Sequence, residues 1–221
     1  MSTLTRNGWP TLASTSALTT IRVEGHTTKL RRGPVAAILA WLVRQLHYGG
    51  IERVVSAFGW RSAATNRAAG GIANSNHLSG TAIDYNGGRH PYEATHDGPY
   101  RSGWDTAQTK AIRALLKFLE GTVAWGIDFN KGFRDAMHFE VRGTAAVLER
   151  VAAKIAGGTV HVTVNDTACR PAPTTSSKVK ARRAIGYEIR YVEVLWREGR
   201  LWLLSSGGNY YAASCTSLTG V

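Results

Sequence analysis

Cysteines and long apolar runs are scarce in this chain of 221 residues, which has only two cysteines, Cys169 and Cys215. Two cysteines exclude a disulfide-rich scaffold. They either pair or remain free thiols, and we favour free thiols. The longest apolar run, residues 35–46, is interrupted by Arg44 and Gln45 and is too short to cross a bilayer. We therefore expect no membrane span.

Acidic residues are also few, since 15 Asp and Glu stand against 27 Lys and Arg, for a formal net charge of +12 at pH 7. Such a balance favours polyanionic partners: nucleic acid, an anionic cell envelope or an acidic membrane surface. The basic residues are scattered, with short clusters at residues 31–32 and 178–183. Dedicated nucleic-acid binders more often concentrate them on one helix or stripe, so we do not expect a nucleic-acid partner.

The first ten residues lack the basic start and apolar core of a signal peptide. We therefore expect synthesis as a cytoplasmic chain, which needs a separate pore if it acts outside the cell. Hydrophobic residues make up 43% of the chain, enough to bury a proper core. The sequence is silent on oligomeric state, and we expect a monomer.

The spacing of apolar residues predicts three helices, at residues 35–47, 106–120 and 144–156. Strands are predicted at residues 54–58, 81–85, 123–125, 138–141, 160–164, 187–196 and 200–204. After Gly157-Gly158 the apolar residues no longer recur at helical spacing, and the chain alternates as in strands. We therefore predict two domains, residues 1–157 and 158–221.

Two short segments, residues 75–84 and 135–140, hold the side chains that point most narrowly to one chemistry. Catalytic zinc is bound by imidazole nitrogen and carboxylate oxygen, with one position left for water. His77, Asp84 and His138 form such a set of two histidines and one aspartate. The sequence therefore predicts a metal-dependent hydrolase with these three residues as ligands.

Asp135 lies one short turn before His138. From there its carboxylate could accept a proton from a metal-bound water and pass it to a leaving amine. Taken singly, a histidine is most often structural, and an aspartate after a strand is usually a turn former. Four suitable residues bracketed by strand and glycine signals favour a functional interpretation.

The pattern Ser-x-His-x-x-Gly-x-Ala-x-Asp at residues 75–84, followed by Asp-x-x-His at residues 135–138, resembles a family of zinc peptidases. That family includes D-alanyl-D-alanine carboxypeptidases and L-alanyl-D-glutamate endopeptidases. Residues 59–62 read Gly-Trp-Arg-Ser where the family has Gly-Tyr-Arg-Ser, and residues 125–129 read Trp-Gly-Ile-Asp-Phe where it has Trp-Gly-Gly-Asp-Trp. Four segments thus occur in the family's order.

The resemblance implies that zinc is held by His77, Asp84 and His138, with Asp135 as general base and acid. It also implies that Arg61 binds a substrate carboxylate or steadies the developing oxyanion, as suits a planar cation with several donors. The alternative for Arg61 is an ordinary surface salt bridge.

Three further residues have supporting roles in this reading. Ser75 would hydrogen-bond near the metal or merely shape the loop. Asp128 is a rival for the general base, although its Trp-Gly-x-Asp context favours a structural or supporting task. Glu140 would orient a ligand histidine from behind.

The family resemblance implies an α+β, hedgehog-like fold with a small antiparallel sheet flanked by helices. The last part resembles a bacterial SH3-like wall-binding module, through residues 167–173 and the late Trp196 and Trp202. We therefore expect a small all-β SH3-like barrel there, and the alternative is a generic small barrel or sandwich.

A zinc peptidase joined to a small β module, without a signal peptide, resembles a bacteriophage endolysin. We therefore expect cleavage of an amide bond in the peptide stem of peptidoglycan, most simply L-alanyl-D-glutamate, and peptidoglycan as the partner. The alternative in the same class is a D-alanyl-D-alanine carboxypeptidase. The alternative of another class is a non-catalytic, zinc-containing wall-binding protein.

Overall fold

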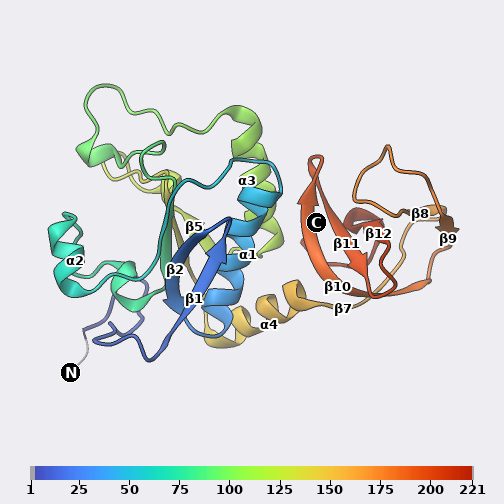
Figure 1. Ribbon diagram of the computed structural model, residues 1–221, viewed down its shortest axis with the longest axis horizontal. Helices are drawn as coiled ribbons and strands as arrows, with labels where there is room; N and C mark the ends of the chain where they lie inside the picture. Colours follow the sequence, from blue (N-terminus) through green and yellow to red (C-terminus); the bar gives the residue numbers. More distant parts are fainter. Residues whose placement is uncertain (1–2, 221) are drawn as a thin grey trace.

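The computed structural model describes residues 3–220, which form an α+β protein with small antiparallel sheets (Figure 1). The α-helices are α1 (Pro34–Tyr48), α2 (Ala63–Ala68), α3 (Thr106–Phe118) and α4 (Ala145–Ala156). The strands are β1 (Leu18–Val23), β2 (His26–Arg31), β3 (Ala57–Phe58), β4 (Ala82–Tyr85), β5 (Val123–Trp125), β6 (His138–Val141), β7 (Gly158–His161), β8 (Thr167–Cys169), β9 (Ala181–Arg183), β10 (Glu188–Arg197), β11 (Arg200–Ser205) and β12 (Tyr210–Ala212). Short 3₁₀ helices are η1 (Asn76–Ser79), η2 (Glu93–Thr95), η3 (Gly126–Asp128) and η4 (Ala213–Cys215). Within residues 3–220, no helix is long and apolar enough to cross a membrane.

The central sheet has the strand order β3-β4-β6-β5, and all of its pairs are antiparallel. Every residue of β4 and β6 is buried, so these two strands form the floor on which the site is built. The strand predicted at residues 54–58 is reduced to Ala57–Phe58. The reason is that the N–H groups of Val55 and Ser56 donate to the Asn86 side chain instead of to a neighbouring strand.

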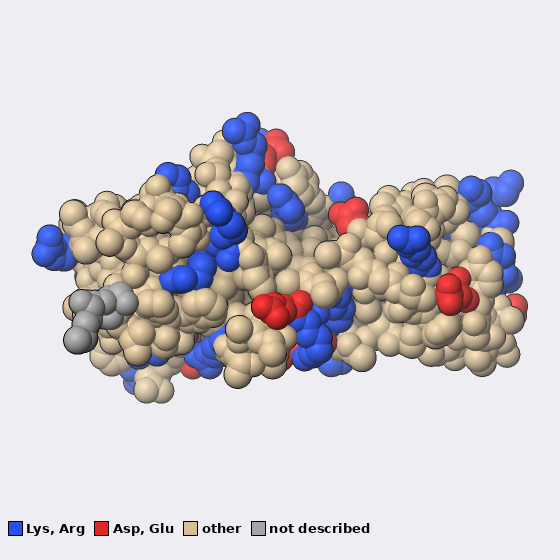
Figure 2. Space-filling view, turned by 90° about the horizontal axis from the view of Figure 1, so that it is seen from below, with Lys and Arg blue, Asp and Glu red and all other residues tan. Residues whose placement is uncertain are grey.

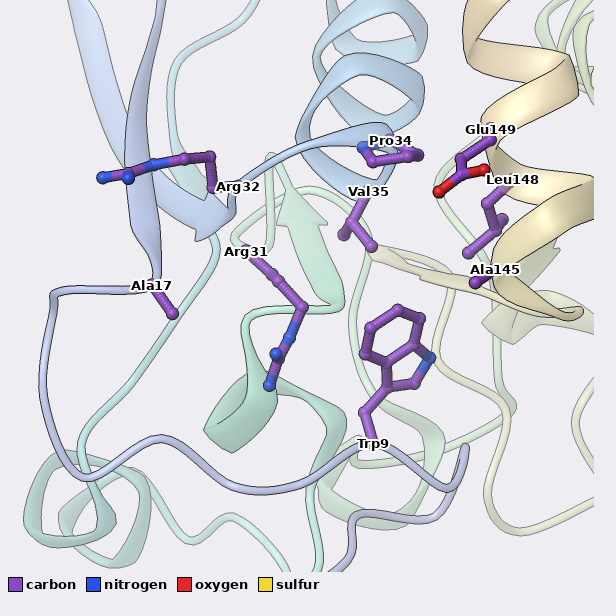
Figure 3. A pocket seen from close by; sticks show the side chains of 9 residues that line it. All are labelled: Trp9, Ala17, Arg31, Arg32, Pro34, Val35, Ala145, Leu148 and Glu149. Carbon is purple, nitrogen blue, oxygen red and sulfur yellow. The ribbon is translucent and has the colours of Figure 1, made fainter.

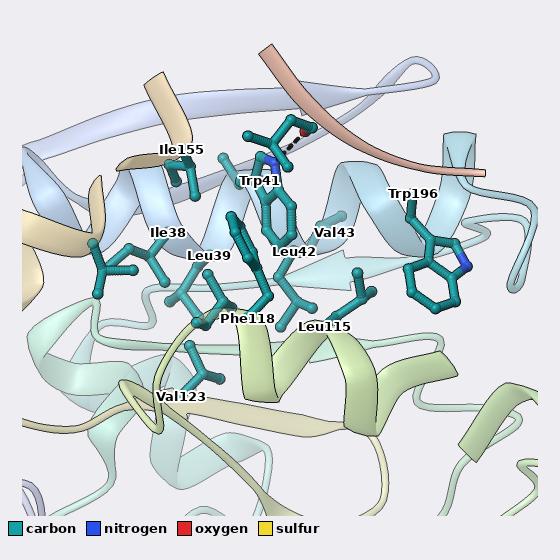
Figure 4. Packing of buried hydrophobic residues seen from close by; sticks show 14 of the residues in the cluster. Ile38, Leu39, Trp41, Leu42, Val43, Leu115, Phe118, Val123, Ile155 and Trp196 are labelled. Atoms are coloured by element: carbon teal, nitrogen blue, oxygen red, sulfur yellow. Dashed lines mark hydrogen bonds between the residues drawn. The ribbon is translucent and has the colours of Figure 1, made fainter. Parts of the chain in front are cut away.

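The three predicted long helices are present as α1, α3 and α4, and they pack around one apolar core (Figure 4). Pro34 occupies the first turn of α1, where its missing N–H is not needed. Helix α3 begins with a capping box between Asp105 and Gln108. Trp41 of α1 and Phe118 of α3 meet with ring centroids 5.1 Å apart, which joins these two helices in the core.

The β1–β2 hairpin was not predicted from the sequence. Its six residue pairs run from Leu18↔Arg31 to Val23↔His26. The two turn residues, Glu24 and Gly25, have φ of 44° and 79°, as expected for a tight two-residue hairpin turn. The hairpin packs on α1 and thereby covers part of the core (Figure 1).

The C-terminal strands correct the expected barrel. Strands β12-β11-β10-β7 form one open four-stranded sheet, and β8 pairs only with β9 in a separate sheet. The isolated bridge Arg170↔Tyr210 connects the β8 side to β12. Because β8 and β9 pair over only three residues, they do not extend a ladder that closes the sheet in the described part of the chain. Cys169 and Cys215 are both free thiols.

The C-terminal sheet is docked firmly on the helices. Trp41 Nε1 donates to the Val194 carbonyl at 2.8 Å, and the Trp196 N–H donates to the Gln45 side chain at 2.8 Å. Apolar residues from both sides of Gly157 belong to one continuous buried cluster. The division at 157/158 stays a prediction about folding units, although α4 does end at Ala156.

Candidate metal centre

Local backbone geometry places the three predicted ligands. His77 lies on η1, which ends at Gly80 with φ of 67°. A Cβ at Gly80 would lie 2.8 Å from the Arg31 backbone nitrogen, so this left-handed turn requires glycine both for its φ and for space. Asp84 on β4 stands directly opposite His138 on β6. The turn and the strand register therefore bring His138 to Asp84 and His77, which lie 54 and 61 positions before it in the chain.

The nitrogen and oxygen atoms of these three residues converge. His77 Nε2 lies 3.1 Å from Asp84 Oδ1, His138 Nδ1 lies 2.9 Å from the same oxygen, and the two nitrogens are 3.3 Å apart. Tetrahedral zinc, with bonds of about 2.0–2.1 Å, holds its ligand atoms roughly 3.3 Å apart. The cluster therefore already has the spacing of three ligands of one ion, and all three residues are buried.

The outer nitrogens of the two imidazoles show which atoms carry protons. His77 Nδ1 lies 2.6 Å from the Gly59 carbonyl, and His138 Nε2 lies 3.2 Å from Glu140 Oε2. Both partners only accept hydrogen bonds, so in a neutral ring these outer nitrogens hold the proton. The inner nitrogens then turn lone pairs toward the Asp84 carboxylate. Three acceptors without a donor between them fit a metal cation.

Without a metal, a proton takes the place of the cation. Burial alone would lower the pKa of His138, but its hydrogen bonds to Asp84 and Glu140 outweigh burial and raise that pKa to about 10. Burial would raise the pKa of Asp84, yet the charges and hydrogen bonds of His77 and His138 hold it well below its usual value. The cluster thus concentrates negative charge that a cation can neutralise.

Asp135 lies beside this cluster in the turn that leads into β6. Its N–H donates to the Gly126 carbonyl at 2.9 Å, and its own carbonyl accepts from the His138 N–H at 3.1 Å. Its Oδ1 is buried and, within residues 3–220, has no hydrogen-bond partner. Burial raises the pKa of Asp135 to about 6, with Asp84 adding to the rise and the charges of His138 and Arg61 opposing it. Such a carboxyl group is suited to take up and release a proton near neutral pH.

Arg61 is fixed on Asp84, one of the three predicted ligands. One of its terminal nitrogens contacts Asp84 Oδ2, the carboxylate oxygen that the two histidines do not share. The Arg61 side chain remains 21% exposed. Ser75 is the N-cap of η1 and accepts from the His77 N–H at 3.4 Å. That position shapes the loop that carries His77.

Glu140 and Asp128 occupy very different surroundings. Glu140 is buried, and its Oε2 meets His138 Nε2 while accepting a hydrogen bond from Asn76 Nδ2. Asp128 is 54% exposed at the end of η3, where both carboxylate oxygens pair with Arg113. Glu140 therefore supports His138, a predicted ligand, whereas Asp128 belongs to a surface ion pair.

Sequence reasoning missed a polar clamp next to Asp135. The Glu93 carboxylate accepts from the Arg134 side chain and from the backbone N–H groups of Gly132 and Arg134. The Arg134 guanidinium also lies over the Tyr100 ring, 4.5 Å from its centroid. Glu93 and Arg134 are 41 residues apart, and no sequence pattern predicts that they form a pair. The clamp fixes the backbone immediately before Asp135.

A cavity of about 390 Å³ lies away from the three ligands, among Trp9, Val35, Leu148 and Glu149 (Figure 3). Arg31 reaches into it, but its donors already bond the Ser79 and Pro10 carbonyls. Its walls are mostly apolar, and its lining contains none of the metal-cluster residues. We assign no chemistry to this cavity.

Comparison with known proteins agrees with the geometry. A family model described as D-alanyl-D-alanine carboxypeptidase matches residues 69–141, and one described as peptidase M15 matches residues 15–97. M15 peptidases are zinc-dependent, so both matches, together with the His-Asp-His group, support a zinc peptidase. Neither match reaches the C-terminal sheet. Searches of the curated proteins and of the solved structures found no match.

Proposed function

We propose that the protein is an endolysin: a zinc-dependent peptidase that hydrolyses an amide bond in the peptide stem of peptidoglycan, most simply L-alanyl-D-glutamate. The observation that carries this proposal is the convergence of three buried acceptor atoms beside Asp135 Oδ1, a carboxyl oxygen that has no hydrogen-bond partner within residues 3–220. A purely structural ion needs the first feature only. A hydrolase needs both, because a proton must move to the leaving amine.

His77, Asp84 and His138 would hold the zinc, which when bound polarises a carbonyl and makes water a stronger acid. Asp135 Oδ1 takes the proton of the attacking water and delivers it to the nitrogen of the departing amine. The pKa of about 6 that burial produces in Asp135 suits both halves of this transfer, because the group is neither a strong acid nor a strong base there.

Arg61 has two tasks in this proposal. Its contact with Asp84 Oδ2 holds that carboxylate in one orientation, so that Oδ1 faces the histidines. The guanidinium donors that remain bind a carboxylate of the stem peptide, which is rich in such groups, or steady the developing negative charge.

Substitutions of Asp135 and of Asp128, its rival for the general base, test the mechanism. Asp135→Asn should abolish hydrolysis of purified peptidoglycan while zinc content stays at the parent level, because Asp135 is not a ligand. Asp128→Asn is the matched control and should retain activity, because Asp128 pairs with Arg113 at the surface. Full lytic activity of Asp135→Asn would end the proposed mechanism.

Mass spectrometry of the released fragments identifies the bond that is cut. New amino-terminal D-glutamate supports the endopeptidase. Free D-alanine as the main product supports the carboxypeptidase, the activity named by the family model that covers residues 69–141. A protein that binds zinc and sediments with cell walls but releases no fragment would be the non-catalytic alternative.

The endolysin role also includes place and form of action. We propose synthesis in the host cytoplasm, release to the wall through a separate pore, and action as a monomer. The net charge of +12 supports retention on an anionic wall, less tightly as salt rises. Residues 158–221 would be the wall-binding part.

A further inference from the structure

The β8–β9 hairpin carries positive charge without any acidic residue. Residues 167–187 contain five Lys and Arg and no Asp or Glu. The five are Arg170, Lys178, Lys180, Arg182 and Arg183. Lys and Arg gather at the end of the molecule (Figure 2) where β8 and β9 lie in Figure 1. The charge therefore has a definite location in the fold.

Three of these cations point the same way. Along residues 178–183, exposed and half-buried positions alternate strictly, as in an extended strand with one covered face. Lys178, Lys180 and Arg182 are the exposed members, and we call them the cationic row. Successive members are two residues apart, which is roughly 6.7 Å along an extended chain. The row is thus a regular line of positive charge on an open face.

The cationic row has no carboxylate partner within residues 3–220. Lys180 Nζ donates to the Asn209 side-chain oxygen at 3.0 Å, and Arg182 Nη1 donates to the Asp166 backbone carbonyl at 3.0 Å. These neutral oxygens orient the side chains without neutralising them. A single lysine is enough to protect an edge strand from pairing, so three charges in line exceed that need.

We propose that the cationic row binds a linear, wall-attached polymer whose phosphodiester groups repeat along its chain. This inference rests on the proposed function, because it takes the bacterial wall as the target. A regular line of cations matches regularly repeating charges better than it matches a single carboxylate. Arginine and lysine both bind phosphate oxygens well, and release of the polymer's counterions favours the complex.

The cationic row and the metal centre lie in different parts of the fold. In Figure 1, β8 and β9 lie at the opposite end of the long axis from α2, which directly follows Arg61 in the chain. The bonds of Trp41 to Val194 and of Gln45 to Trp196 fix the C-terminal sheet on the helices. The row therefore anchors the whole molecule on the wall and leaves the metal centre free for the stem peptide.

Single-stranded nucleic acid is a poorer occupant. Such ligands are normally held by aromatic rings on which bases stack, together with cations. Among residues 158–220, the exposed aromatic residue is Tyr187, and Arg183 already lies over its ring, 4.5 Å from the centroid. The row itself contains no aromatic residue. The surface thus offers charge without a stacking platform.

Two triple variants with the same loss of charge test the proposal. Lys178→Gln, Lys180→Gln and Arg182→Gln together remove the row, whereas Arg190→Gln, Arg197→Gln and Arg200→Gln remove three exposed cations of β10 and β11. Each is made in the Asp135→Asn background, so that walls stay intact during sedimentation. The walls are used as isolated and after acid removal of their phosphodiester polymers.

The row variant should bind phosphodiester-bearing walls at least about tenfold more weakly at 150 mM salt, and its salt dependence should fall by about 2 in log K per log salt for three lost contacts. The β10–β11 variant should lose less than about threefold. Stripped walls should bind the parent about as weakly as intact walls bind the row variant. With Asp135 restored, both variants should cleave a short soluble stem peptide at the parent rate.

Equal losses in the two triple variants would show that only net charge matters and would overturn the proposal. Undiminished binding to stripped walls would overturn it too. An oligonucleotide that binds the row as tightly as the walls do at 150 mM salt would identify nucleic acid as the partner instead. Absence of peptide cleavage in every variant, with binding as expected, would refute the proposed enzyme and leave the anchoring surface standing. Melting curves confirm that each variant is folded.

Discussion

Replacing Glu140 by alanine is expected to weaken zinc binding by about 10- to 100-fold without unfolding the protein. In the structure, Glu140 Oε2 lies 3.2 Å from His138 Nε2 and also accepts from Asn76 Nδ2. The carboxylate thus holds the outer N–H of a ligand imidazole and fixes the lone pair on Nδ1 toward Asp84. Without it, the ring is free to rotate and to exchange its tautomer.

The magnitude follows from how such supports act. Loss of a partner that orients a ligand histidine typically costs 10- to 100-fold in metal affinity, or about 1.4–2.7 kcal/mol. We expect the upper part of that range, because Glu140 is 8% exposed and water can replace it only poorly. Glu140→Gln keeps a side-chain oxygen and the volume, so this variant should lose less zinc affinity than Glu140→Ala.

The measurement is a zinc titration in competition with a chromophoric chelator at fixed pH. Glu188→Ala, which alters an exposed glutamate of β10, is the control and should keep the parent affinity. A Glu140→Ala protein that binds zinc within twofold of the parent would show that the His138 ring is held by packing alone. The reasoning from the hydrogen bond would then be wrong.

Three further outcomes are expected. Chelation should abolish peptidoglycan hydrolysis, and added zinc should restore it. Magnesium should not restore it, because two of the three predicted ligands are imidazoles, which bind zinc better than magnesium. Recovery with magnesium would contradict the assigned ligands. Gly126→Ala should lower kcat by roughly 10- to 100-fold at unchanged zinc content. The Cβ of the new alanine would lie 2.2 Å from the Asp135 carbonyl oxygen, so the turn that carries Asp135 must move. Kinetics like those of the parent would show that Asp135 takes no part in the reaction. Trp41→Phe should lower the free energy of unfolding by about 1–3 kcal/mol, because the buried Val194 carbonyl loses its donor, and an unchanged Tm would show that the C-terminal sheet does not depend on this bond.

Elements with a strong periodic signal could be predicted from the sequence alone. Helices α1, α3 and α4 have apolar residues at helical spacing and clear end signals, and strands β4, β5 and β6 lie where they were predicted. The β1–β2 hairpin carries a readable signal in its Glu24-Gly25 turn, but it was not predicted. Strand β12, which spans only three residues, was not predicted.

The expected barrel failed for a related reason. Sequence periodicity indicates that a segment is a strand but not which strand it pairs with. The alternation along β10 and β11 is equally compatible with a closed barrel and with the open sheet that is present. Pairing of β8 with β9 in a separate sheet is a tertiary outcome that this alternation does not specify.

The sequence by itself determined the kind of chemistry, because ligand type depends on which side chains are present: two imidazoles, one carboxylate and an additional aspartate. Only the tertiary structure decided how they act together. The register of β4 against β6 sets Asp84 opposite His138, and among the described residues the buried Asp135 Oδ1 has no hydrogen-bond partner. The same holds for the cationic row: its charge can be read from the sequence, but the lack of a carboxylate partner for its side chains within residues 3–220 depends on packing. Distances between residues far apart in the chain arise from packing, and packing is a property of the whole fold.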